Sequence, residues 1–110
     1  MPSANVFVSD ELEVVVTSNL PEIRRLVALE LSTARKSLTS DQVSIRVTTV
    51  RAQMQLNPVE IEIFGHAFWH RLRRVDARAQ RVALAVSKVV DAPVSCWLNL
   101  SVVGYSQSTK

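Results

Sequence analysis

The side chains best suited to catalysis or ligand binding lie near the middle of the chain, in residues 59–66. The first five of these residues alternate between apolar and polar, as expected for a half-buried strand, and Glu60 and Glu62 share one side of it. His66 and His70 have the four-residue spacing of zinc ligands on a helix. In a strand, however, residues four apart are separated by roughly 13 Å, which is too far to share one ion. We therefore expect no metal site here.

Other catalytic and cofactor motifs are absent from the sequence. The single cysteine, Cys96, excludes an internal disulfide framework and a multi-cysteine zinc site. We find no Ser/His/Asp arrangement, glycine-rich phosphate loop or CxxC motif, so hydrolase, nucleotide-binding and redox classes have no support, and we expect no cofactor. A secretory signal and an apolar run approaching 18 residues are also lacking, which favours a soluble, cytoplasmic protein.

A cluster of arginines is the main basic feature of a chain with net charge +3. That charge permits nucleic-acid binding without requiring it. We interpret the cluster as a solvated helix edge whose aliphatic stems cover the margin of the core. The alternative is a surface that contacts phosphate or nucleic acid. We do not expect a nucleic-acid partner. The cluster consists of Arg71, Arg73, Arg74, Arg78 and Arg81.

The elements that position these residues follow a repeated order. At 110 residues and 47% apolar content, the chain fits one compact domain. Residues 11–17 are rich in β-branched side chains and predict a strand, with a second, shorter candidate at residues 5–8. Asn19 fits a helix N-cap, with Glu22 in the capping-box position. The helix that follows has an apolar stripe formed by Leu20, Ile23, Val27, Leu31, Ala34 and Leu38.

The second half of the chain repeats this pattern. Residues 42–51 predict a strand that closes the first unit, and the strand beginning at Val59 opens the second. A helix from about Asp76 and a last strand over 96–103 complete it, and residues 45–50 align with a stretch that begins 53 positions later. The second helix has the stripe Val75, Ala79, Val82, Val86 and Val89.

Two strand–helix–strand units predict an α+β fold. Each unit gives a parallel strand pair, and joining the pairs edge to edge gives a four-stranded mixed sheet with both helices on one face. We divide the chain into an amino-terminal extension or extra strand (1–10), a single domain of two repeats (11–51 and 59–104) and a polar tail (105–110).

The sheet face opposite the helices should be mixed in character. Parallel sheets are seldom left bare on one side, so we expect this face to pack against another subunit, with its charges paired there. A solvated face on a monomer is the alternative. The residues expected on this face are Ser44, Arg46, Thr48, Glu60, Glu62, Phe64, His66, Trp97 and Asn99.

Several short stretches resemble the tautomerase superfamily, which includes 4-oxalocrotonate tautomerase and macrophage migration inhibitory factor. Residues 44–47 (Ser-Ile-Arg-Val) resemble the strand that carries a substrate-binding arginine in the former enzyme. Residues 63–66 (Ile-Phe-Gly-His) and 97–99 (Trp-Leu-Asn) are similar to pocket-lining segments of the latter. Residues 91–93 (Asp-Ala-Pro) resemble the passage from helix to strand in 4-oxalocrotonate tautomerase. The resemblance covers about residues 11–104.

This resemblance implies a homotrimer with pockets between subunits that bind a small carboxylate or keto acid. The family's chemistry uses an amino-terminal proline as acid or base in keto–enol isomerisation. Removal of Met1 would place Pro2 at that position, with Arg46 as the carboxylate anchor. Phe64, His66, Trp97 and Asn99 would line the pocket.

The amino-terminal segment departs from the family pattern. If the first strand begins near Glu11, a ten-residue extension displaces Pro2 and the usual chemistry is lost. We favour this interpretation over a first strand spanning residues 3–9. Two further hypotheses stay open: a non-catalytic member of the same fold that serves assembly or ligand binding, and a ferredoxin-like dimer, whose sheet would be antiparallel.

Overall fold

The chain forms one mixed four-stranded sheet with the strand order β2-β1-β3-β4. The computed structural model describes residues 2–33, 37–66, 74–101 and 108. β1 pairs in parallel with β2, β3 pairs in parallel with β4, and the central strands β1 and β3 are antiparallel. This is the predicted mixed sheet, and its two parallel pairs are incompatible with the ferredoxin-like alternative. The strands are β1 (Ser3–Ser9), β2 (Ser44–Val50), β3 (Val59–His66) and β4 (Val94–Ser101).

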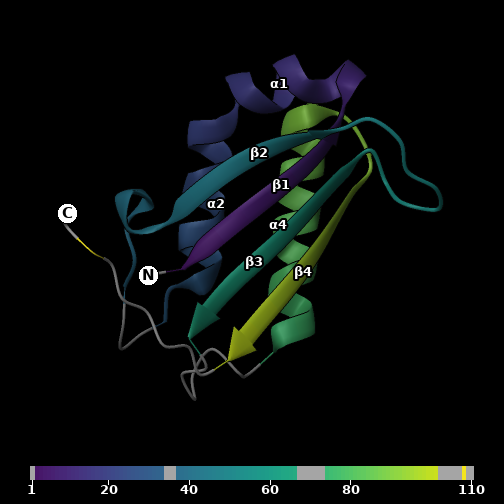
Figure 1. The fold of residues 1–110 in the computed structure, drawn as a ribbon. Helices are drawn as coiled ribbons and strands as arrows, with labels where there is room; N and C mark the ends of the chain where they lie inside the picture. The colour runs from purple at the N-terminus through teal and green to yellow at the C-terminus, as the bar shows by residue number, and fades with distance from the viewer. Residues whose placement is uncertain (1, 34–36, 67–73, 102–107, 109–110) are drawn as a thin grey trace.

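The helices of the described residues cover one face of this sheet. Figure 1 shows α2 and α4 behind the strands, with α1 near the end of β1. The predicted α+β class is thus confirmed. None of the described helices is long and apolar enough to cross a membrane. The helices are α1 (Glu13–Ser18), α2 (Leu20–Leu31) and α4 (Val75–Val90), with short 3-10 turns η1 (Asp10–Leu12) and η2 (Ser40–Gln42).

The core lies between the sheet and the two long helices. Because strand side chains alternate, every second residue of β1 and β3 faces the helices, and each helix contributes one stripe. The residues at the centres of the predicted apolar stripes are buried, while Val75, Ala79 and Val89 are only half-buried. Each fully buried aliphatic side chain contributes about 1.5–3 kcal/mol. The fully buried members include Val6, Val8, Ile23, Val27, Val43, Val59, Ile61, Ile63, Val82 and Val86.

The predicted strand over residues 11–17 is wrong: this segment forms η1 and α1. The first strand is Ser3–Ser9, and it fills the position between β2 and β3. Val16 is the one α1 residue that is fully buried, whereas Val14 is 73% exposed. The helix-propensity penalty of β-branched residues is up to about 0.7 kcal/mol each. It is smaller than the stabilisation that burial in the tertiary structure supplies.

The start of the first long helix is predicted correctly, but not its capping interaction. The Asn19 side chain donates to the backbone oxygen of Val15 at 2.8 Å and makes no cap hydrogen bond to α2. Glu22 pairs with Arg25 at 2.7 Å instead of reaching back to the cap. The described helix ends at Leu31, short of the predicted stripe's last members.

Arginines of α4 bind to α2. Arg78 donates to the backbone oxygen of Glu30, and Arg81 pairs with the Glu30 carboxylate at 2.9 Å. These contacts give Arg78 and Arg81 a structural role between the two helices, while the covering of the core margin by their aliphatic stems stays a prediction. Arg71 and Arg73 lie outside the described residues.

Candidate functional site

The sheet face opposite the helices is organised in three cross-strand rows. Residues paired across neighbouring strands point to the same side, so the register defines each row. From β2 to β4 the rows are Ser44, Ser3, Phe64 and Asn99; then Arg46, Asn5, Glu62 and Trp97; then Thr48, Phe7, Glu60 and Ser95. The structure thus brings the predicted face residues onto one surface, which we call the open face.

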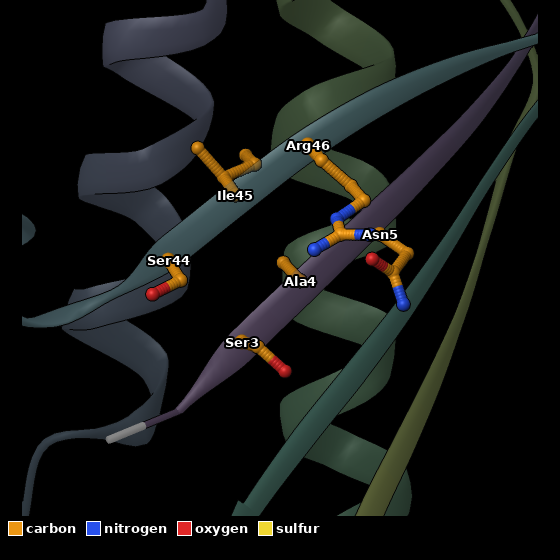
Figure 2. Close-up of a pocket in the computed structure, with 6 residues that line it drawn as sticks. All are labelled: Ser3, Ala4, Asn5, Ser44, Ile45 and Arg46. Carbon is orange, nitrogen blue, oxygen red and sulfur yellow. The ribbon is translucent and has the colours of Figure 1, made fainter. Parts of the chain in front are cut away.

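A cavity of about 280 Å³ lies at one end of the open face, between β1 and β2. We call it the arginine cavity; it is lined by Ser3, Ala4, Asn5, Ser44, Ile45 and Arg46. Figure 2 shows the Arg46 side chain crossing over β1, so that its guanidinium group lies near Asn5. The Ser3 hydroxyl lies on the same strand, nearer its beginning. The cavity therefore combines one exposed cation with neutral hydrogen-bonding groups, a set suited to an anionic oxygen ligand.

Pro2 lies at the same end of the sheet. It is buried, directly precedes β1, and its backbone oxygen accepts a hydrogen bond from the Ser44 N–H at 3.0 Å. The next residue, Ser3, lines the arginine cavity. The expectation that a ten-residue extension displaces Pro2 from the first strand is therefore wrong, because the strand begins one residue after the proline.

The other predicted pocket residues lie elsewhere on the open face. Phe64 is 40% exposed and pairs with Ser3 on one side and Asn99 on the other. His66 is half-buried at the end of β3. Among the predicted residues only Arg46 lines the arginine cavity within the single chain, so the roles of the others stay predictions.

Trp97 belongs to a second cavity, of about 400 Å³, at the opposite end of the open face. We call it the glutamate cavity. Its lining includes Phe7, Met54, Leu56, Glu60, Glu62 and Trp97. Glu60 is only 7% exposed; its carboxylate accepts hydrogen bonds from the Trp97 indole N–H at 3.3 Å and from the Asn57 backbone N–H at 3.2 Å.

Sequence reasoning missed the β1 residues of the arginine cavity, Ser3, Ala4 and Asn5. These residues lie on β1, whereas the sequence predicted the first strand at residues 11–17. The signal was present, because residues 3–9 alternate strictly between Ser, Asn or Phe and small apolar residues. The β-branched run that follows has a high strand propensity, and this propensity obscures the alternation.

Two further candidates are a metal site and the thiol of Cys96. Within the described residues no group of three or more His, Cys, Asp or Glu could hold a metal ion, and His70 lies outside those residues. Cys96 packs against the core on the helix side of β4. Burial raises the pKa of its thiol to about 12, which keeps the sulfur protonated and a poor nucleophile at neutral pH.

Comparison with known proteins shows the fold directly. No family model and no curated protein sequence matches the chain. Among solved structures, native fused 4-OT aligns with 98% of this chain and 94% of its own, at 9% identity and a TM-score of 0.71. A macrophage migration inhibitory factor-like protein from Entamoeba histolytica aligns with 97% of this chain and 96% of its own, at 14% identity and a TM-score of 0.65.

A third structure extends the same likeness. N1, a member of the cis-3-chloroacrylic acid dehalogenase family, aligns with 98% of this chain and 81% of its own, at 14% identity and a TM-score of 0.56. All three alignments span nearly the whole chain. The chain therefore has the fold of the tautomerase superfamily.

Proposed function

We propose that this protein is a tautomerase-like protein that binds a small carboxylate or keto acid and moves a proton in keto–enol isomerisation. The observation that carries the proposal is the position of Pro2: it is buried, immediately before β1, beside a cavity that contains Arg46. A base and an anion anchor are the two groups that this chemistry needs.

Each residue has a defined task in the proposed reaction. Once Met1 is removed, the secondary amine of Pro2 takes a proton from the carbon next to the substrate carbonyl, which leaves an enolate. The resulting ammonium returns a proton to carbon or oxygen, so the amine is regenerated. Arg46 pairs with the substrate carboxylate, and its planar guanidinium can bind both oxygens. Ser3 and Asn5 supply neutral hydrogen bonds beside it.

Self-association would complete the pocket. Phe64, Trp97 and Asn99 are exposed on the open face of the single chain, and buried apolar surface is what stable subunit contacts need. One similar structure is described as an asymmetric trimer of fused 4-OT. We propose a homotrimer in which Phe64, His66, Trp97 and Asn99 shape pockets at the subunit boundaries.

The test begins with the intact mass of the purified protein, which shows whether Met1 is removed. Ketonisation of the enol of phenylpyruvate is then followed for the wild type and for Pro2→Ala. General acid–base catalysis contributes roughly 10²–10⁴-fold, so we expect Pro2→Ala to lose about that factor in kcat. Pro21→Ala, at an exposed proline in the first turn of α2, is the matched control. Full activity of Pro2→Ala, or of protein that retains Met1, would contradict the proposed mechanism.

A non-catalytic ligand-binding or assembly module of the same fold is the second candidate. It is favoured by the low identity, at most 14%, to the three structures above, since such similarity speaks for the fold alone. In that case phenylpyruvate binds, Arg46→Gln weakens its binding, and no ketonisation occurs after Met1 is removed.

A further inference from the structure

The glutamate cavity is the strongest feature of the open face that the proposed function does not use. It lies at the end of β1 that contains Phe7, whereas the arginine cavity lies at the Ser3 end. At about 3.3 Å per residue, Ser3 and Phe7 are roughly 13 Å apart along the strand, and the two linings meet between them, where Asn5 pairs with Glu62. The cavity is about 400 Å³ in volume, which falls in the range of small-molecule sites.

The charge in this cavity is negative, and among the described residues no ion pair balances it; Arg46, in the same cross-strand row as Glu62, is separated from it by Asn5. Among the described residues the ion pairs are Arg25–Glu22 and Arg81–Glu30, so neither Glu60 nor Glu62 takes part in one. Arg51, the basic residue that precedes the connector, is exposed and does not line the cavity.

Glu60 makes this lack of a counterion energetically important. Glu60 is only 7% exposed. Its carboxylate accepts hydrogen bonds from two neutral groups, the Asn57 backbone N–H at 3.2 Å and the Trp97 indole N–H at 3.3 Å. A buried carboxylate without a cation is costly, and a carboxylate can accept more than two hydrogen bonds. A cation in the cavity would recover this cost.

The remaining lining is apolar and aromatic. Trp97 and Phe7 approach from β4 and β1, and Met54 and Leu56 come from the connector between β2 and β3. Met54 is 87% exposed, Leu56 55% and Trp97 60%, so an apolar ligand would remove substantial surface from water. Aromatic faces also attract ammonium groups. A metal ion would use the carboxylates and leave this surface exposed, whereas an amine with a hydrocarbon body would use both.

We infer that the glutamate cavity binds an organic cation, a primary ammonium group on a short apolar or aromatic body. The ammonium lies between the Glu60 and Glu62 carboxylates, where its three N–H donors replace water. The hydrocarbon body packs against Trp97 and the connector side chains. This site adjoins the arginine cavity where Asn5 pairs with Glu62, and it has the opposite charge preference.

Three probes of similar shape and different charge test the inference. Phenethylammonium is the cation, 2-phenylethanol is its neutral counterpart, and 3-phenylpropanoate is the anion. The Trp97 indole N–H, which donates to Glu60, gives a local NMR signal that Trp97→Phe assigns. We expect phenethylammonium to shift this signal and to bind at least about tenfold more tightly than 2-phenylethanol, since hydrogen bonds to charged groups contribute roughly 1.5–3 kcal/mol.

Charge-neutral variants then locate the contact. Glu60→Gln keeps an acceptor for the indole N–H, and Glu62→Gln removes the half-buried charge beside it. Each should weaken phenethylammonium binding by about tenfold or more. Glu13→Gln, at an exposed position of α1, makes the same charge change away from the cavity and should bind normally. If Glu60→Gln fails to fold, Glu62→Gln alone decides the outcome.

Several results would overturn the inference. They are equal binding of 2-phenylethanol, unchanged binding in the Glu60→Gln/Glu62→Gln double variant, or an unmoved Trp97 signal. If wild-type protein ignores the amine while the double variant loses its oligomeric state in sedimentation, the cation is a side chain of a second copy and not a ligand. Pro2→Ala should bind the amine normally, which separates this result from failure of the proposed function.

Discussion

The two cavities of the open face share a scaffold but differ in charge. The arginine cavity contains an exposed guanidinium with serine and asparagine neighbours, while the glutamate cavity contains two carboxylates with aromatic and aliphatic neighbours. β1 contributes to both, through Ser3 and Asn5 at one end and Phe7 at the other. One alternating strand can therefore support opposite binding preferences, because neighbouring residues on one side are about 6.6 Å apart.

The separation of the charges has a physical consequence. Arg46 and Glu62 belong to the same cross-strand row, but Asn5 lies between them on β1. Neither charge neutralises the other through an ion pair in the described structure. Each charge therefore stays available for a ligand or for another subunit.

The largest expected effect tests the shared scaffold. Ile61 is fully buried between Glu60 and Glu62 in the sequence of β3, on the helix side of the sheet. Ile61→Ala should lower the free energy of unfolding by about 2–5 kcal/mol, because it leaves a cavity in the core. Urea denaturation followed by circular dichroism measures it. Thr48→Ala, at an exposed position of β2, should change stability by no more than about 0.5 kcal/mol. A similarly small loss for Ile61→Ala would contradict the core assignment.

A smaller effect tests the charge difference between the cavities. Arg46→Gln should weaken phenylpyruvate binding by about 10- to 100-fold, since it removes a charged hydrogen-bond donor, and should leave phenethylammonium binding unchanged. Isothermal titration calorimetry measures both. Lys88→Gln, exposed on α4, changes the net charge equally and is the control. Parallel loss of both ligands in Arg46→Gln would show that the two cavities are not independent.

The smallest effect compares the two sides of the sheet. Cys96 faces the core, and burial raises its thiol pKa from 9.0 to about 12. Iodoacetamide should therefore modify the folded protein slowly at pH 8 and the urea-unfolded protein quickly. Asn99→Cys in a Cys96→Ala background puts a thiol on the exposed side of the same strand and should react quickly when folded. Equal rates for the two folded proteins would argue against the assigned orientation of β4.

The same pKa has a predictable effect on stability. The folded-state pKa lies above the ordinary value, so the thiol's contribution to stability is complete below about pH 9 and declines as the pH rises toward 12. The difference in unfolding free energy between the wild type and Cys96→Ala should shrink over this range. A constant difference would show that the thiol is not buried when folded.

Much of the candidate site could be predicted from the sequence. The period-two pattern placed Arg46, Glu60, Glu62 and Trp97 on one face, because adjacent strand residues point to opposite sides. Their division between two cavities could not be predicted. It depends on which strand lies beside which and in what register, and these pairings join residues as far apart as Glu62 and Trp97.

The sequence by itself determined the strands from Ser44 onward, the long helices and the side of the sheet that each residue faces. Hydrophobic periodicity is a local property of the sequence. It therefore predicts an element correctly where only one segment can occupy a given position in the fold. Only the tertiary structure decided between residues 3–9 and residues 11–17 as the first strand. Both segments can form a strand, but the position between β2 and β3 admits one, and residues 3–9 fill it with three buried side chains. That choice places Pro2 beside the arginine cavity.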